Sequence, residues 1–474
     1  MANILICDLP WKGKKYAGRT GMRWAHTSNK EPVVSFRPFP FYLATTAAVL
    51  ENGGHRVMIL DALAERLDDE TFFKRAVDFQ PDFILAEVHT PSYNNDRFYF
   101  AELKKATGAK NIFVGPHPTA MPEQVIKENP GVADFVVISE YDFLALDIAE
   151  GRVGEGIVKQ HEVTDINKIP WPARHLFKMN LYNEVFCREY PNIQLMGSRG
   201  CPFMCTYCNV FTMNNFTRKQ RTREPKDIWD EAEFVVAKHK PKELYFDDDI
   251  INATPKWFDA FLQEKIDRGI DIPFTCMGHV NISEQLLEKM KQANCVGWKL
   301  GIESTDDNVL RTLRKGTNHA IQMRTLGKCK ELGIKCHLNF CIGLPGDTEE
   351  TVKKTLEFAE SWGDHYQVSI AAPLPGTELF EAALKNSWIQ EINWDEFDGM
   401  EDAIIQYPHL PIDTLKKLAM RGQSNTYKKT LLTGEWKKYV KMIYNERGVT
   451  GVAKLVFIRG PGITKEILFS RSAD

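Results

Sequence analysis

The stretch Gly200-Cys201-Pro202-Phe203-Met204-Cys205-Thr206-Tyr207-Cys208 carries three cysteines in the spacing CxxxCxxC. It follows an apolar run that predicts a buried strand, so we expect the three thiols to lie on one loop. Three thiolates on a loop can hold three irons of a [4Fe–4S] cube and leave the fourth iron open to a small molecule. Zinc is the structural alternative, but it takes four protein ligands, and the nearest further cysteines, Cys187 and Cys276, are not paired with another. The spacing therefore predicts an open iron–sulfur cluster.

The sequence around this loop alternates between strands and helices. Helical patterns (residues 229–238, 283–292, 318–332 and 349–361) separate apolar runs that predict six strands: residues 192–196, 243–246, 273–277, 297–301, 335–342 and 366–371. This alternation is typical of a partial (β/α)6 barrel, whose chemistry belongs on the loops at the carboxyl ends of its strands. We assign residues 191–385 to it.

A second β/α region precedes the barrel. Five apolar runs predict strands at residues 2–7, 55–60, 83–86, 111–114 and 135–138, with helices between them. The pattern indicates a doubly wound parallel, Rossmann-like sheet over residues 1–150, followed by a proline-containing linker over residues 151–190. Neither a GxGxxG motif nor a P-loop lysine is present, so a nicotinamide or nucleoside triphosphate site is poorly supported.

Ligands of such sheets sit at the carboxyl ends of the strands. The residues found there are Asp61, Thr90, Ser92, Gly115, Pro116, His117, Pro118, Thr119, Ser139 and Glu140. Gly115 and Pro116 are also what an ordinary strand-to-loop turn contains, and His117 could be an ordinary loop histidine.

Composition restricts the class of protein. The chain has 474 residues, 43% hydrophobic and 26% charged, with a net charge of −3. This excludes a disordered chain and strong nucleic-acid-type basicity, and we expect no nucleic-acid partner. No apolar run is long enough for a membrane span, and the N-terminus lacks the pattern of a signal peptide. Ten cysteines in such a chain indicate reduced thiols and a cytoplasmic protein.

The C-terminal residues 386–474 predict a small helical domain that is basic. From Asp413 to Asp474 there are 13 Lys plus Arg against 5 Asp plus Glu, with aromatic residues interleaved. A solvated helix face is the simpler interpretation. The other is a surface for anionic lipid headgroups or an acidic substrate, which would place the protein at the inner membrane face.

The CxxxCxxC loop resembles that of the radical SAM superfamily, and further segments match in barrel order: FDDD at 246–249, LGIES at 300–304, LNFCIGLPGD at 338–347 and PLPGT at 373–377. The resemblance implies that Cys201, Cys205 and Cys208 hold a [4Fe–4S] cluster whose open iron binds S-adenosyl-L-methionine (SAM). It also implies SAM contacts from Tyr207, Asp248, Glu303, Ser304, Asn339 and Leu344. Reduction of the cluster would cleave SAM to methionine and a 5′-deoxyadenosyl radical.

The N-terminal region resembles the cobalamin (B12)-binding domains fused to radical SAM barrels, in the group that includes anaerobic magnesium-protoporphyrin IX monomethyl ester cyclase and hopanoid methylases. The matching segments are residues 39–43, 54–61, 115–123 and 134–140. The resemblance implies that the strand-end residues named above, from Asp61 to Glu140 with the exception of Ser139, contact cobalamin. Ser139 replaces the usual glycine, and the DxHxxG motif that supplies a histidine to cobalt is missing, which suggests a cobalamin without a protein histidine below the metal.

Several residues have a plain structural alternative. Asp247 to Asp249 could be a helix cap and a solvated loop. Glu303 follows a buried strand and needs partners, which a ribose diol would supply. His279 is a candidate contact for substrate or cobalamin, with a structural role as the alternative. The cysteines outside the cluster loop in the barrel (Cys276, Cys295, Cys329, Cys336 and Cys341) are expected to be buried apolar residues.

These observations predict an enzyme in which two cofactors face each other across a domain interface, with no side chain assigned a catalytic role. The favoured function is a methyltransferase that abstracts hydrogen from an unactivated carbon and methylates it through methylcobalamin. A cyclase or other carbon-skeleton reaction with the same cofactors is the alternative, and a non-catalytic corrinoid or electron carrier is the third. The expected partners are a small-molecule substrate, for which a lipid is one option, and a reductant such as flavodoxin or ferredoxin.

Overall fold

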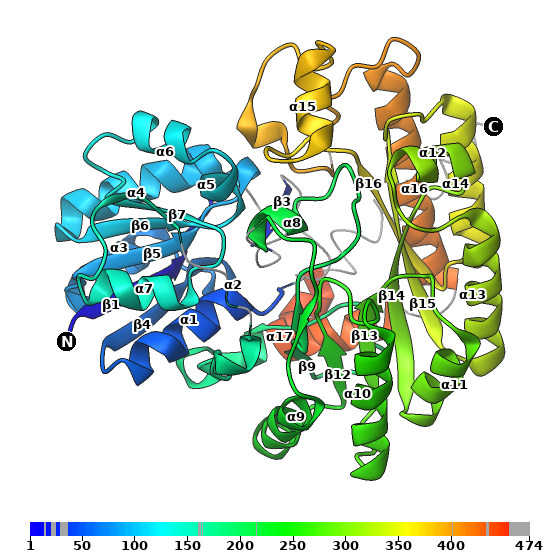
Figure 1. Cartoon of the computed structure of the whole chain (residues 1–474), viewed down its shortest axis with the longest axis horizontal. Helices are drawn as coiled ribbons and strands as arrows, with labels where there is room; N and C mark the ends of the chain where they lie inside the picture. The colour runs from blue at the N-terminus through cyan, green and yellow to red at the C-terminus, as the bar shows by residue number, and fades with distance from the viewer. Residues whose placement is uncertain are drawn as a thin grey trace.

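Two six-stranded parallel sheets form the framework of the protein, as the computed structural model shows (Figure 1). The structure describes residues 1–13, 16–19, 25–28, 37–159, 163, 165–214, 216–400, 402–432 and 436–454. The predicted α/β class, with an N-terminal Rossmann-like sheet, a partial barrel and a helical C-terminal region, is confirmed.

The N-terminal sheet has the order β4-β1-β5-β6-β7-β8. The strand order reverses at β1. The next two strands of this sheet along the chain, β4 and then β5, lie on opposite sides of β1, as in doubly wound folds. All five predicted strands are present, and a sixth, β8, lies within the predicted linker. The strands are β1 (Asn3–Asp8), β4 (Arg56–Asp61), β5 (Phe83–Glu87), β6 (Lys110–Val114), β7 (Phe135–Ile138) and β8 (Gly156–Lys159).

Helices cover both faces of this sheet. Because successive strand residues point to opposite faces, Ile4 and Ile6 join one core while Leu5 and Cys7 join the other. Helices α1 (Phe41–Asn52) and α7 (Asp142–Ala149) supply the first core; α3 (Asp69–Phe79) and α4 (Tyr93–Thr107) supply the second. Shorter elements at its edges are α2 (Ala62–Glu65), η1 (Thr90–Ser92), α5 (Pro116–Ala120), α6 (Pro122–Glu128) and the hairpin β2 (Tyr16–Arg19) and β3 (Ala25–Ser28).

The second sheet has the order β16-β15-β14-β13-β12-β9, so its strands follow one another in chain order, each parallel to the next. Among the described residues β9 and β16 are not paired with each other, which leaves the barrel partial. The strands are β9 (Asn192–Leu195), β12 (Glu243–Phe246), β13 (Phe274–Gly278), β14 (Cys295–Glu303), β15 (Lys335–Ile342) and β16 (His365–Ile370). All six predicted strands are therefore confirmed.

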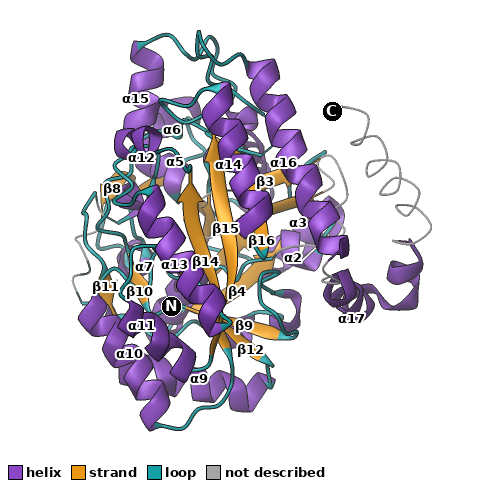
Figure 2. Ribbon diagram, turned by 90° about the vertical axis from the view of Figure 1, so that its right-hand side faces the viewer, coloured by secondary structure: helices purple, strands orange, loops and turns teal. Residues whose placement is uncertain are grey.

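The barrel helices lie on the outer face of the sheet (Figure 2). They are α9 (Pro225–His239), α10 (Pro255–Asp267), α11 (Glu284–Gln292), α12 (Asp307–Thr312), α13 (His319–Leu332) and α14 (Glu349–Trp362). The core between helices and sheet includes Cys276, Cys295, Cys329, Cys336 and Cys341. These five cysteines are buried and free, as the sequence predicted.

The C-terminal region divides between the two halves of the molecule. Helix α15 (Glu378–Lys385) and η5 (Trp394–Glu396) contribute Phe380, Trp394 and Phe397 to a core of the N-terminal sheet. Helix α16 (Ile412–Leu432) instead packs on β16 and α14. At Gly422 a Cβ would meet Leu356 and Val368 at 2.8 and 2.9 Å, so glycine permits this close approach.

Helix α17 (Trp436–Lys454) is the last described element (Figure 2). Much of the predicted basic surface, including Phe457, Leu468 and Phe469, lies outside the described residues. Among the helices that the structure describes, none combines the length and apolar character required to cross a membrane.

Candidate active site between the two sheets

The three-cysteine loop lies at the start of the barrel, after β9 and the two-residue strand β10 (Ser198–Arg199), which pairs with β11 (Arg221–Thr222). Backbone contacts fix its course. The Thr206 amide donates to the Leu313 carbonyl at 3.1 Å, and the Thr206 carbonyl accepts from the Leu379 amide at 3.0 Å. The Arg218 guanidinium donates to the Phe203 carbonyl at 2.7 Å. The loop is therefore held from several sides.

The thiols of Cys201, Cys205 and Cys208 are all free and partly exposed. Burial raises the pKa of each thiol, that of Cys208 to about 12, and neighbouring cysteines raise the pKa of Cys201 and Cys208 further. The three thiols lie on one loop of eight residues, as the predicted cluster requires. Among the described residues, no three metal-binding side chains converge on a single point. A [4Fe–4S] cluster does not require its three thiolates to meet at one point, because each thiolate binds a separate iron.

His279 packs against this loop. Its ring stacks on Phe203, with centroids 4.1 Å apart and planes at 13°. The Nε2–H donates to the Lys315 carbonyl at 2.9 Å, and Nδ1 accepts from the Asn281 amide at 3.1 Å. Burial lowers the pKa of His279 to about 4, consistent with a neutral ring. Both ring nitrogens are thus engaged within the protein, which favours the structural role over the substrate contact.

A buried ion pair lies beside the cluster loop. The Lys315 ammonium donates to Glu303 Oε1 at 2.8 Å, and both side chains are about nine-tenths buried. Glu303 and the thiols of Cys205 and Cys208 raise the pKa of Lys315, so its charge lies within electrostatic reach of these two cysteines. Glu303 has a φ of 64°, a left-handed conformation that is uncommon for a residue with a side chain. Sequence reasoning identified Glu303 but missed Lys315.

Tyr207 packs against the barrel core beside this ion pair. Burial raises the pKa of Tyr207, and the charges of Glu303, Cys205 and Cys208 raise it further, which places its phenol near both the ion pair and the thiols. Tyr207 and Glu303 therefore lie in the same region as the cysteines that we expect to hold the cluster.

Two carboxylates after β12 hold the strand that leads into the loop. Asp248 accepts from the Ser198 hydroxyl at 2.5 Å and from the Gly197 amide at 3.2 Å. It is fully buried, and desolvation raises its pKa to about 7. Asp249 accepts from the Gly200 amide at 2.9 Å. The predicted SAM contact Asp248 thus already orients the loop that precedes Cys201.

The remaining predicted SAM residues lie along β14 and β15. Ser304 is buried and its hydroxyl lies 3.5 Å from that of Thr355. Asn339 is within β15, where its Oδ1 lies 3.2 Å from a ring nitrogen of His337. Leu344 is fully buried just beyond the strand. Ser304 and Leu344 lie at the carboxyl edge of the barrel, where Ser304 follows Glu303 and Leu344 belongs to the GLPG turn.

The carboxyl edge of the N-terminal sheet carries the predicted cobalamin residues. Asp61 caps α2 by accepting from the Ala64 amide at 2.7 Å, and it also accepts from the Tyr182 hydroxyl at 2.7 Å. The Ser92 hydroxyl donates to Asp96 at 2.5 Å. Asp61 and Ser92 thus have structural partners on the edge where a ligand is expected.

The turn after β6 is compact. Gly115 has a φ of 105°, and a Cβ there would lie 3.0 Å from the Val88 backbone, so glycine lets β6 approach β5 at this point. Pro116 and Pro118 are in α5. The Thr119 hydroxyl donates to the Gly115 carbonyl at 2.7 Å and accepts from the Ser139 amide at 2.9 Å. This network fixes the rim of the candidate cobalamin site.

His117 is the most exceptional residue of this rim. It is fully buried, and its Nδ1 lies 3.3 Å from the Thr90 hydroxyl. Its ring lies 4.2 Å from that of Tyr93 and 5.1 Å from that of Trp394 of η5. Its Nε2 has no hydrogen-bond partner among the described residues, and burial lowers the pKa of the ring to about 3. An unpartnered buried nitrogen is what a ligand's polar group could satisfy, so His117 fits a cofactor site.

A buried charge, Arg19 of the β2–β3 hairpin, also lies at this edge. It pairs with Asp8 at 2.8 Å and Asp96 at 2.8 Å, and it donates to the Glu87 carbonyl at 2.5 Å. Sequence reasoning missed Arg19, because nothing local distinguishes it from a surface arginine.

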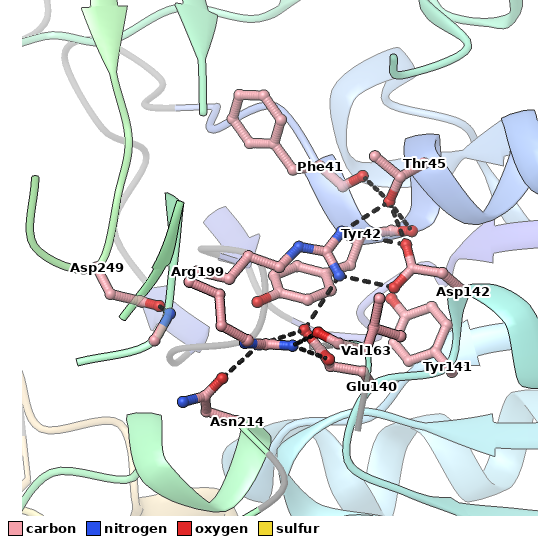
Figure 3. Close-up of polar contacts among 12 residues, drawn as sticks. Phe41, Tyr42, Thr45, Glu140, Tyr141, Asp142, Val163, Arg199, Asn214 and Asp249 are labelled. Carbon is pink, nitrogen blue, oxygen red and sulfur yellow. Dashed lines mark hydrogen bonds and ion pairs between the residues drawn. The ribbon is translucent and has the colours of Figure 1, made fainter. Parts of the chain in front are cut away.

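The two edges meet in a buried group of four charges, which we call the interdomain ion cluster. It consists of Arg221 and of Glu140, Asp142 and Arg199, which Figure 3 labels. Arg199 binds Asp142 with two contacts of 2.7 and 3.1 Å, and Arg221 binds Glu140 with two contacts of 2.8 Å. The exposed fraction of all four side chains is 5% or less. Glu140, predicted to contact cobalamin, therefore has both carboxylate oxygens bound to arginine.

Known protein families match both halves of the chain. The model of the Radical SAM superfamily matches residues 195–359, and that of the B12 binding domain matches residues 33–145. An uncharacterized methyltransferase of Pyrococcus horikoshii is 29% identical, covering 82% of this chain and 87% of the relative. The anaerobic magnesium-protoporphyrin IX monomethyl ester cyclase of Rubrivivax gelatinosus is 25% identical, covering 72% of this chain and 66% of the relative.

Solved structures agree on the fold. The radical S-adenosylmethionine methyltransferase TsrM of Kitasatospora setae, with cobalamin and a [4Fe-4S] cluster bound, has a TM-score of 0.60 at 16% identity, covering 82% of this chain and 79% of that chain. The cobalamin-dependent S-adenosylmethionine radical enzyme OxsB, with aqua-cobalamin bound, also has a TM-score of 0.60, at 12% identity, covering all of this chain and 81% of that chain.

Proposed function

The chain belongs to the radical SAM superfamily and carries a B12-binding domain, and on this premise we propose that it is a methyltransferase acting on an unactivated carbon. The cofactors of these two domains are a [4Fe–4S] cluster with SAM and cobalamin. The observation that carries the proposal is the position of the CxxxCxxC loop, which is tied through Arg199 to the carboxyl edge of the N-terminal sheet. The two candidate cofactor sites therefore face the same interface.

The cofactors supply the chemistry when bound: an electron and an adenosyl group from the cluster with SAM, and a methyl group from cobalamin. We assign Cys201, Cys205 and Cys208 as the cluster ligands. Glu303 and Tyr207 would orient SAM, because both lie beside the thiols, and Lys315 holds Glu303 in place. His117, Thr90 and the Gly115 turn would line the cobalamin site. Burial of His117, Thr90, Glu303 and Lys315 would keep water away from a reactive radical.

Anaerobic reconstitution tests this proposal. We expect the protein to take up iron, sulfide and cobalamin, and to release S-adenosylhomocysteine and 5′-deoxyadenosine in about equal amounts during methylation. The variant Cys205→Ala is the matched control, since it removes one ligand and leaves the cobalamin edge intact. Formation of 5′-deoxyadenosine without S-adenosylhomocysteine would refute methylation and support the cyclase alternative, which the relatedness to the magnesium-protoporphyrin ester cyclases makes the second candidate. A failure of wild-type protein to cleave SAM would leave only a corrinoid or electron carrier.

We further propose that an acidic one-electron donor of the flavodoxin or ferredoxin class reduces the cluster. Met204 of the cluster loop is 49% exposed, and Phe216, which follows the loop in the chain, is 41% exposed. Lys159 lies over Phe216 at 5.4 Å. Arg218 lies over the neighbouring ring of Phe211 at 4.4 Å and also donates to the carbonyl of Phe203, next to Met204. Cations therefore lie near both exposed side chains. We expect the rate at which flavodoxin reduces the cluster to fall as the salt concentration rises, with the rate for dithionite as the reference. A flavodoxin rate that does not change with salt would argue against an acidic donor.

The proposed substrate is a small hydrophobic molecule, with a lipid as one option, and the proposed location is the cytoplasm, with peripheral contact to an anionic membrane. The support is the basic C-terminal composition alone. Liposome sedimentation with and without anionic lipid tests it, and equal sedimentation with both would remove the membrane contact.

A further inference from the structure

The interdomain ion cluster joins the two ends of the cluster loop to one short segment of the N-terminal domain. Arg199 precedes Gly200 and Cys201, and it binds Asp142 and Glu140. After the loop, the Thr212 carbonyl accepts from the Ser139 hydroxyl at 2.7 Å. Arg221, which is paired with Arg199 across β10 and β11, binds Glu140. Residues 139–142 therefore hold the loop on both sides of its three cysteines.

The geometry of these contacts is specific. Both arginines bind a carboxylate with two donors, an arrangement that fixes orientation as well as distance. The Arg199 guanidinium also lies 4.0 Å from the centre of the Tyr42 ring and donates to Thr45 at 3.1 Å (Figure 3). Arg221 in turn donates to the Val163 carbonyl at 2.7 Å and to Asn214. The two guanidinium groups are thus constrained on several sides.

The start of the loop cannot move independently of these contacts. Gly200 has a φ of 85°, and a Cβ there would lie within 2.4 Å of both Asn214 and the Lys219 carbonyl. Its amide is held by Asp249. A displacement of Arg199 would therefore be passed directly to Cys201, one residue beyond Gly200.

Burial of four charges is a poor way to gain stability, because desolvation of the ions offsets their attraction. An apolar contact of the same volume would often be at least as stable, so the placement of the charges calls for another reason. The contacts join the loop that we assign to the cluster with the strand end that follows β7, at the cobalamin edge.

We propose that the interdomain ion cluster is a positioning device that fixes the cluster loop relative to the cobalamin-binding sheet, and that Arg199 is its central positioning residue. The proposal rests on the function proposed above. The device sets the separation and orientation of the two cofactor sites, on which transfer of a group from one to the other depends. Glu140 and Asp142 act in this device through their ion pairs with Arg199 and Arg221.

The test uses Arg199→Lys, which keeps the charge but loses the paired donors. The matched control is Arg174→Lys, because Arg174 is also buried and paired with a carboxylate, Glu231 at 3.0 Å, but does not touch the cluster loop. Hydrogen–deuterium exchange of the cofactor-free chain should show faster exchange, by about tenfold, in the peptides covering both 139–142 and 198–214 of Arg199→Lys. Arg174→Lys should leave both peptides unchanged. Faster exchange in only one of these two segments, or in neither, would overturn the proposal.

A second readout uses the loaded protein. In wild type and Arg199→Lys brought to equal iron and cobalamin content, the magnetic interaction between reduced cluster and cob(II)alamin is measured by electron paramagnetic resonance. A positioning role predicts a changed or broadened interaction in Arg199→Lys but not in Arg174→Lys, whereas an identical interaction in all three would overturn it. Asp142→Asn breaks the same contact, so the double variant should be no worse than either single one. Absence of either cofactor in wild type would refute the proposed function, while the exchange experiment would still decide the attachment.

Discussion

The substitution Asp248→Asn should make the barrel less sensitive to pH. Asp248 is fully buried after β12 and accepts hydrogen bonds from Ser198 and Gly197, but burial still raises its pKa from 3.8 to about 7. The folded state therefore binds a proton more tightly than the unfolded state. Its contribution to stability is fully present below about pH 4 and is lost as the pH rises through about 7.

The size of the effect follows from the shift in pKa. A shift of about 3 units corresponds to about 4 kcal/mol over the whole range. Between about pH 5.5 and about pH 7.5 the loss is about 2 kcal/mol. Because asparagine does not ionise, wild type should lose this amount relative to Asp248→Asn over the same interval.

Urea unfolding of the cofactor-free chain measures the difference, with the fluorescence of the buried barrel residues Trp229 and Trp298 as the signal. Asp364→Asn is the control, since that carboxylate is 38% exposed and paired with Lys335 at the surface. The stability difference between wild type and Asp248→Asn should change by about 2 kcal/mol, and that for the control should stay constant. A difference that does not vary with pH would show that Asp248 is ionised throughout and that its hydrogen bonds outweigh its burial.

Three further outcomes are expected. Cys205→Ala should abolish iron uptake and the visible absorption of the cluster while cobalamin still binds, and retention of a full cluster would contradict the ligand assignment. Lys315→Met should lower the free energy of unfolding by about 3–5 kcal/mol, because it leaves Glu303 buried without its partner; Lys315→Met/Glu303→Gln should recover part of this loss, and no recovery would contradict the coupling. Trp394→Ala should lower the free energy of unfolding by about 3–5 kcal/mol and expose His117, and the measurement is the melting temperature, which should fall. An unchanged melting temperature would show that η5 does not hold the N-terminal core.

The sequence was sufficient where the signal is local. The eleven strands predicted in the two sheets are confirmed, because each is a compact apolar run between turn residues. The strand β8 was missed because its inward and outward positions alternate over only four residues, with a lysine at the end. The CxxxCxxC loop could also be identified from the sequence, because its three cysteines lie within one segment.

Contacts between distant segments could not be predicted in this way. Arg199 and Asp142 are 57 positions apart, and no pattern near either residue indicates the other. Lys315 follows a short helix and reads as a surface residue until β14 brings Glu303 to it. His279 had two interpretations from its strand-end position, and the contacts of both ring nitrogens, together with the stacking on Phe203, favour the structural one. The assignments of cobalamin and SAM contacts remain predictions.

The two halves of the protein are joined by different kinds of contact at different places, and this division has a physical logic. Phe380, Trp394 and Phe397 of the C-terminal region enter an apolar core of the N-terminal sheet, which supplies non-directional attraction between the halves. Such packing alone would tolerate small rotations. The paired donors of Arg199 and Arg221 do not, because a bidentate contact is lost when the planes of guanidinium and carboxylate tilt apart. Attraction therefore comes from the C-terminal segment, and orientation from the charges beside the cysteines.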